Sequence, residues 1–117
     1  MFREVYGDTV PAPPTGEVEA FDLLVIDQQF AEVWARPGLS VPSRRLLVMG
    51  VLAARGHVDT LETQFRRALE TGELTPAQVR EVVIHLIGYV GTPSSSGLIN
   101  AGETAIADHA GRADRTP

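Results

Sequence analysis

Apolar residues recur at intervals of three or four along most of this chain, the spacing that places side chains on one face of a helix. Between Glu17 and about Ala35 this spacing predicts a first helix, which ends where Pro37 and Gly38 interrupt it. No stretch alternates apolar and polar residues over a useful length, so no strand is predicted. The pattern indicates an all-α fold.

Two further helices are predicted in the middle of the chain. The second begins near Pro42, because proline is tolerated in the first turn of a helix, and ends at Gly56. It is apolar on nearly all sides after Arg45, which is typical of a helix buried within a bundle or between subunits. The third helix, from Val58 to Thr71, is amphipathic and ends at Gly72, a residue suited to a left-handed cap.

The start of a fourth helix is the clearest local signal in the sequence. Thr75 supplies a capping hydroxyl, Pro76 suits the first helical position, and Gln78 can close a capping box. This helix is predicted to continue to the break at residues 91–93, and a last helix to cover about residues 95–109. The whole pattern predicts a compact bundle of about five to six helices.

The length of 117 residues is that of a single domain. Its helical core is predicted over residues 17–110, followed by a flexible tail at residues 111–117. Pro and Gly crowd residues 7–16, which favours an extended arm over residues 1–16, although a loose tail fits the same composition. A domain this small leaves much of its surface outside the core, so the apolar second helix favours an oligomer.

The residue types that are missing exclude several functions. The chain contains no Cys and no Lys, which excludes disulfides, thiol catalysis and Schiff-base chemistry on a lysine. The net charge is -5 and the basic residues are scattered, so nucleic acid is not an expected partner. We find no signal-peptide pattern and no apolar stretch of membrane-spanning length, and therefore expect a cytoplasmic protein without a membrane partner. The histidines show no ligand spacing, so no metal is expected.

Three polar residues of the fourth predicted helix are candidates for acid–base chemistry. Glu81, His85 and Tyr89 follow one another at four-residue intervals and therefore share a helix face. A carboxylate beside an imidazole can set the tautomer of the ring and stabilise its charged form. The same spacing also fits a structural role, in which Glu81 is exposed, His85 packs against a neighbouring helix and Tyr89 lies in the core.

Arg44 and Arg45 are candidates for binding an acidic substrate, because they precede a wholly apolar stretch and a guanidinium can bind a carboxylate through two hydrogen bonds. A surface ion pair with Glu32 or Glu62 is the alternative. Trp34 could stack on a substrate or serve as an apolar anchor in the core or between subunits.

Several of these segments together resemble the carboxymuconolactone decarboxylase family. The resemblance covers about residues 20–108, and its most specific parts are residues 36–39, 43–45 and 72–78 and the pattern E-x3-H-x3-Y-x-G-x-P from Glu81 to Pro93. It implies an alkyl hydroperoxidase D-like helical fold, assembled into homotrimers or hexamers with active sites near the subunit interfaces. Because the chain lacks a CxxC pair, the resemblance is to a cysteine-free branch without thiol peroxidase activity.

The reaction implied by this resemblance is the loss of CO2 from γ-carboxymuconolactone, without a cofactor. A small-molecule carboxylate or aromatic compound is thus the expected partner. In this reaction Arg44 or Arg45 would orient a carboxylate, and His85 or Tyr89, supported by Glu81, would protonate the product carbon.

The chain departs from the family pattern at two places that bear on the substrate. Many relatives carry a histidine where this chain has Gln64, which cannot exchange a proton near neutral pH but remains a candidate substrate-binding residue. Ser95 lies in a hydroxyl-rich stretch where relatives often have alanine, so its hydroxyl is a candidate for lining a more polar pocket. These departures leave two alternatives open: a tailoring enzyme for polyketide or aromatic secondary metabolites, or a non-catalytic oligomeric binding protein.

Overall fold

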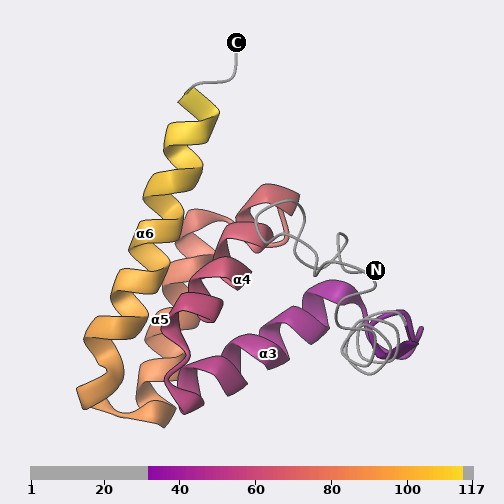
Figure 1. The fold of residues 1–117 in the computed structure, drawn as a ribbon, viewed down its shortest axis with the longest axis horizontal. Coiled ribbons are helices and arrows are strands. Elements are labelled where there is room, and N and C mark those ends of the chain that lie inside the picture. Colours follow the sequence, from indigo (N-terminus) through magenta and orange to yellow (C-terminus); the bar gives the residue numbers. More distant parts are fainter. Residues whose placement is uncertain (1–31, 115–117) are drawn as a thin grey trace, which may run out of the picture.

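The computed structural model describes residues 32–114, and these residues are helical with no strand (Figure 1). The α-helices are α3 (Val41–Arg55), α4 (Val58–Thr71), α5 (Pro76–Val90) and α6 (Ser95–Asp114). One turn of 3-10 helix, η2 (Thr92–Ser94), connects α5 to α6. The all-α class predicted from the sequence is confirmed.

Local capping interactions define the ends of α3 and α4. The Ser40 side chain accepts a hydrogen bond of 3.2 Å from the backbone N–H of Ser43 at the start of α3. Gly56 and Gly72 follow α3 and α4 in the left-handed conformation, each with a φ of 75°, which a residue with a Cβ adopts at a cost. The predicted ends of both helices are confirmed.

The capping box predicted at the start of α5 is also present. The backbone N–H of Gln78 donates to the Thr75 hydroxyl at 3.2 Å, and the backbone N–H of Thr75 donates to the Gln78 side chain at 2.9 Å. Two backbone donors that a helix start leaves unpaired are thereby satisfied. Because both partners lie within three residues, the sequence alone was sufficient to place this start.

The last helix is longer than its sequence pattern indicates. We expected it to end at about His109, but α6 continues to Asp114. Arg112 forms ion pairs with Asp108 at 3.2 Å and with Glu70 of α4 at 3.5 Å. Contacts with α4 therefore support a segment whose own sequence carries few helix signals.

The core lies between α4, α6 and the inner faces of α3 and α5. In Figure 1, α6 runs alongside both α4 and α5, and α3 crosses them at an angle. Leu61 and Phe65 of α4 and Leu98 of α6 are almost completely buried. At Gly102 the helices α5 and α6 approach so closely that an added Cβ would lie 3.2 Å from the side chain of Val83.

Only one face of α3 is buried in the single chain. Arg45 and Met49 point into the core, whereas Leu46, Leu47 and Val51 are between 47% and 61% exposed. The sequence predicted burial on nearly all sides, whereas the structure leaves a second apolar face of α3 exposed in the described chain. No helix of the described part of the chain is long and apolar enough to cross a membrane.

Two predicted segments lie outside the described residues. The N-terminal arm at residues 1–16 and most of the expected first helix belong to this part of the chain. Trp34 and Ala35, at the expected C-terminal end of that helix, lie in a turn. The predicted break at Pro37 and Gly38 follows this turn.

Candidate functional site

The structure places Glu81, His85 and Tyr89 along one exposed face of α5. The rings of His85 and Tyr89 are in contact, with centroids 5.2 Å apart and an angle of 47° between the planes. Tyr89 is 80% exposed, so the alternative in which it belongs to the core is wrong for the single chain. Glu81 lies one turn before His85, and within residues 32–114 no hydrogen bond joins the two.

Glu81, His85 and Tyr89 have groups that can transfer protons, but no other part of the described chain covers them. An imidazole in contact with a phenol can give or accept a proton near neutral pH. Water reaches all three side chains, whereas catalysis of this kind is favoured where water is excluded. A complete site at this position therefore requires a covering surface.

A second polar group joins α3, α4 and the connection between α4 and α5. The Nη1 of Arg45 donates to the Gln64 side-chain oxygen at 2.7 Å, and the Nε of Arg45 donates to a Glu73 carboxylate oxygen at 2.6 Å. Arg45 is 1% exposed and Gln64 is fully buried. We call Arg45, Gln64 and Glu73 the buried polar cluster.

The amide nitrogen of Gln64 has no hydrogen-bond partner in this cluster. A guanidinium only donates, so the Gln64 oxygen must face Arg45 and the NH2 group must point away from it. A buried donor without a partner costs about 1–3 kcal/mol, and such groups usually meet a water or a ligand. The Gln64 amide is therefore a candidate contact for an oxygen atom of a substrate.

Glu73 is the member of the cluster that the sequence interpretation missed. Its carboxylate receives the Arg45 guanidinium across 28 residues of sequence, and no local motif marks that pairing. A cavity of only about 30 Å³ lies beside Arg45 and Glu73, which is room for a water rather than for a substrate.

Arg44 has a different environment from Arg45. Its Nε donates to the backbone oxygen of Leu39 at 3.2 Å, and its Nη2 donates to that of Arg36 at 3.1 Å. Arg44 thus stabilises the turn that precedes α3. Neither arginine forms the alternative surface pair with Glu62, which pairs with Arg66 at 2.7 Å instead.

The remaining two candidates lie at the start of the described chain and at the start of α6. Trp34 is 7% exposed, as expected for an apolar anchor in the core. Ser95 is the first residue of α6 and is partly buried. The structure brings neither residue into contact with His85 through any described hydrogen bond or ring contact.

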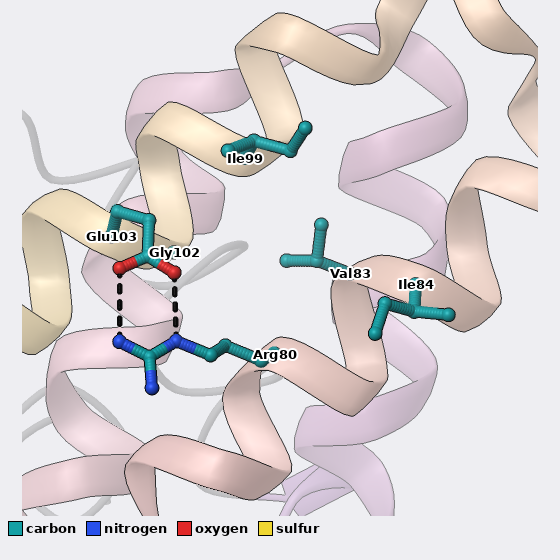
Figure 2. A pocket seen from close by; sticks show the side chains of 6 residues that line it. All are labelled: Arg80, Val83, Ile84, Ile99, Gly102 and Glu103. Carbon is teal, nitrogen blue, oxygen red and sulfur yellow. Dashed lines mark hydrogen bonds and ion pairs between the residues drawn. The ribbon is translucent and has the colours of Figure 1, made fainter.

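A pocket of the described chain lies between α5 and α6, and its lining includes none of these candidates (Figure 2). It has a volume of about 230 Å³ and is lined by Arg80, Val83, Ile84, Ile99, Gly102 and Glu103. Arg80 and Glu103 form a bidentate ion pair at its edge, in which Nε and Nη2 of Arg80 donate to the two carboxylate oxygens of Glu103 at 2.8 Å and 3.1 Å. The sequence interpretation did not identify this pocket.

The ion pair at the edge of this pocket shifts the pKa of both Arg80 and Glu103. The hydrogen bond with Arg80 lowers the pKa of the Glu103 carboxyl below its ordinary value, and the charge of Arg80 acts in the same direction. The pKa of Arg80 is raised, first by the hydrogen bond and then by the charge of Glu103. Within the described residues, no group of three or more metal-binding side chains is present.

Comparison with known proteins places these residues in a family. The model of the carboxymuconolactone decarboxylase family matches residues 20–104, a range that contains every candidate site residue. The chain therefore belongs to the carboxymuconolactone decarboxylase family.

Two characterised relatives carry the name of a decarboxylase. The chain is 33% identical over 79 residues to a 4-carboxymuconolactone decarboxylase of Acinetobacter baylyi, covering 68% of this chain and 58% of that protein. It is 35% identical over 71 residues to a nitrosuccinic acid decarboxylase of Metarhizium robertsii, covering 61% of this chain and 49% of that protein. The matched segment thus spans about half the length of these relatives, and no solved structure matches the chain.

Proposed function

We propose that this chain is a cofactor-independent decarboxylase of a small carboxylic acid, with γ-carboxymuconolactone or a related lactone acid as its substrate. The observation that carries the proposal is the family match over residues 20–104, joined by two relatives named as decarboxylases of different acids. The absence of cysteine and lysine is compatible with this reaction, because it needs neither a thiolate nor a Schiff base.

The chemistry of the two named substrates narrows the class of acid. In nitrosuccinic acid the nitro group can take up the electron pair released with CO2, and in carboxymuconolactone the unsaturated lactone can do so. An acid of this kind carries its own electron acceptor. The protein then has to orient the carboxylate, exclude water and supply one proton.

His85 is the proposed proton donor. The bond between the carboxylate and its carbon breaks, CO2 leaves, and the electron pair moves into the neighbouring electron-withdrawing group. The resulting dienolate or nitronate then takes a proton on carbon from His85, which regains one from solvent. Tyr89, in ring contact with His85 at 5.2 Å, and Glu81, one turn away, are the proposed supporting groups.

The buried polar cluster suggests how the substrate oxygen is bound. Glu73 already balances the charge of Arg45, so the amide nitrogen of Gln64, which has no partner among the described residues, is better suited than Arg45 to donate to a bound water and through it to a substrate oxygen. Arg45 would then hold the Gln64 amide in its orientation. Roles for Arg44, Trp34 and Ser95 in substrate binding remain predictions.

The test is CO2 release by the purified protein from γ-carboxymuconolactone and, separately, from nitrosuccinic acid. We expect turnover of at least one acid, and His85→Ala should lower kcat by about 100-fold or more, the usual contribution of a positioned acid. His57→Ala is the matched control, because His57 is exposed and its side chain makes no capping hydrogen bond. A folded protein that turns over neither acid contradicts the proposal, and full activity of His85→Ala removes His85 from its role.

A further inference from the structure

The pocket between α5 and α6 has apolar walls on both helices. Figure 2 shows Ile99 of α6 on one side of the opening and Val83 and Ile84 of α5 on the other. Ile84 and Ile99 are 63% and 45% exposed, so both side chains line the pocket and remain open to solvent. A ligand that enters from solvent therefore meets hydrocarbon on two opposite sides, which is favourable for an apolar molecule.

The two helices that form the pocket are held to each other. Gly102 lets α6 approach α5, because an added Cβ there would lie 3.2 Å from the side chain of Val83 and 3.4 Å from that of Val79. At the edge of the pocket, the bidentate pair of Arg80 and Glu103 joins the same two helices. A ligand gains from such a preformed site, because no segment has to be ordered when it binds.

The charges at the edge of the pocket already engage each other. Arg80 donates to both carboxylate oxygens of Glu103, and the lowered pKa of Glu103 keeps this carboxylate ionised at neutral pH. The pair has no net charge, and no other charged residue of the described chain lines the pocket. An ionised ligand would lose hydration against the apolar walls without gaining a partner, so the pocket favours an uncharged ligand.

The volume of the pocket limits the size of that ligand. The pocket measures about 230 Å³. Sites for drug-sized molecules usually measure about 300–1,000 Å³, whereas an apolar cavity of about 150 Å³ is large enough to bind benzene. One ring with a short substituent lies between these limits, and its flat shape suits a space between two apolar walls.

We propose that this pocket binds an uncharged single-ring aromatic compound between Ile84 and Ile99. The Arg80–Glu103 pair selects against ionised ligands, because neither of its charges is available to them. None of the candidate residues of the proposed reaction lines this pocket, so the proposal does not depend on the decarboxylase activity.

NMR of isoleucine methyl groups tests the site, with p-cresol as the uncharged probe. p-Cresol should shift the δ1-methyl signals of Ile84 and Ile99 in a saturable way, with a Kd of about 0.1–1 mM as expected for a ligand of this size. Ile106 is the internal control, because it also belongs to α6 but packs against the core and does not line the pocket. Shifts that do not saturate in this range, or that are equally large at Ile106, overturn the proposal.

A matched pair of alanine variants tests the apolar wall. Ile99→Ala should raise the Kd for p-cresol by about threefold or more, because less apolar surface covers the ring. Leu47→Ala is the control, because Leu47 is also an exposed apolar residue of a helix but lies on α3. Alanine is favourable in helices, and circular dichroism verifies that both variants fold. An unchanged Kd in Ile99→Ala, or an equal rise in Leu47→Ala, contradicts the proposed position of the ring.

The role of the ion pair is tested with p-toluate, which carries a carboxylate in place of the hydroxyl of p-cresol. It should bind the parent protein more weakly than p-cresol does. Glu103→Gln releases Arg80 from its carboxylate partner, so p-toluate should then bind about threefold or more tightly than to the parent, while p-cresol changes little.

Glu81→Gln is the control for this change, because it removes the same charge from an exposed position of α5 and leaves the Arg80–Glu103 pair intact. Equal binding of p-toluate and p-cresol to the parent, or no gain for p-toluate in Glu103→Gln, would show that the assigned class of ligand is wrong.

Discussion

Two Arg–Glu pairs in this chain have nearly the same geometry and opposite surroundings. The Arg45–Glu73 pair has a shortest distance of 2.6 Å with side chains 1% and 12% exposed. The Arg80–Glu103 pair has a shortest distance of 2.8 Å with side chains 55% and 48% exposed. Both join segments that are distant in sequence.

The difference shows that burial, more than distance, decides what an ion pair contributes. Water and salt screen the exposed pair, and its attraction competes with the hydration of both side chains. The buried pair is protected from that screening, but both of its charges have given up most of their hydration. Removing one partner should therefore have very different consequences at the two places.

The largest expected effect is the loss of the carboxylate in the buried polar cluster. Glu73→Ala removes the carboxylate to which the buried Arg45 guanidinium donates, and we expect it to lower the free energy of unfolding by about 3–5 kcal/mol. Urea denaturation followed by circular dichroism, at one protein concentration, measures this loss.

Glu70→Ala is a matched control for that experiment. Glu70 pairs with Arg67 at 3.4 Å and with Arg112 at 3.5 Å, and all three side chains are more than 20% exposed, so its loss should be small. Equal losses for Glu73→Ala and Glu70→Ala would show that water reaches Arg45 in solution and that the two environments do not differ as described.

An intermediate effect is expected at Gln64. Gln64→Leu removes a hydrogen bond to a charged group, worth about 1.5–3 kcal/mol, but it also removes a buried unpaired donor whose cost is about 1–3 kcal/mol. These changes oppose each other, so we expect the free energy of unfolding to change by about 1 kcal/mol or less. Urea denaturation of Gln64→Leu, carried out alongside that of Glu73→Ala, measures this change in the free energy of unfolding. A loss as large as that of Glu73→Ala would mean that the Gln64 amide nitrogen is hydrogen-bonded in solution.

The smallest effect on stability is expected at the exposed pair, and it should depend on pH. The pKa of Glu103 is lower in the folded chain than in the unfolded chain, because Arg80 donates hydrogen bonds to the ionised carboxylate. The ionised carboxylate therefore stabilises the folded state above the unfolded pKa near 4.5, and this contribution is lost as the pH falls through the folded value.

Glu103→Gln should consequently be slightly less stable than the parent at neutral pH, and the difference should disappear in acid and shrink in high salt. Thermal unfolding between pH 7 and pH 3, at one protein concentration, measures it. Glu81→Gln is the control, because Glu81 is exposed and has no ion pair among the described residues. A stability difference that grows as the pH falls would contradict the assigned sign.

The sequence by itself determined the all-α class, most ends of the described helices and the family. The capping box of Thr75 and Gln78 and the left-handed Gly56 and Gly72 were predictable because each depends on residues within a few positions. The end of α6 was misplaced because Arg112 is supported by Glu70 on another helix as well as by its own neighbour Asp108.

The tertiary structure alone decided which candidate residues meet. It joined Arg45 to Gln64 and to Glu73, the latter across 28 residues, and left Tyr89 exposed where the sequence allowed a core position. It also paired Arg80 with Glu103 across 23 residues, beside a pocket that no sequence motif predicts. The physical reason is the range of the interactions: a cap is completed within one turn of a helix, whereas the burial and pairing of a charge depend on how separate helices pack.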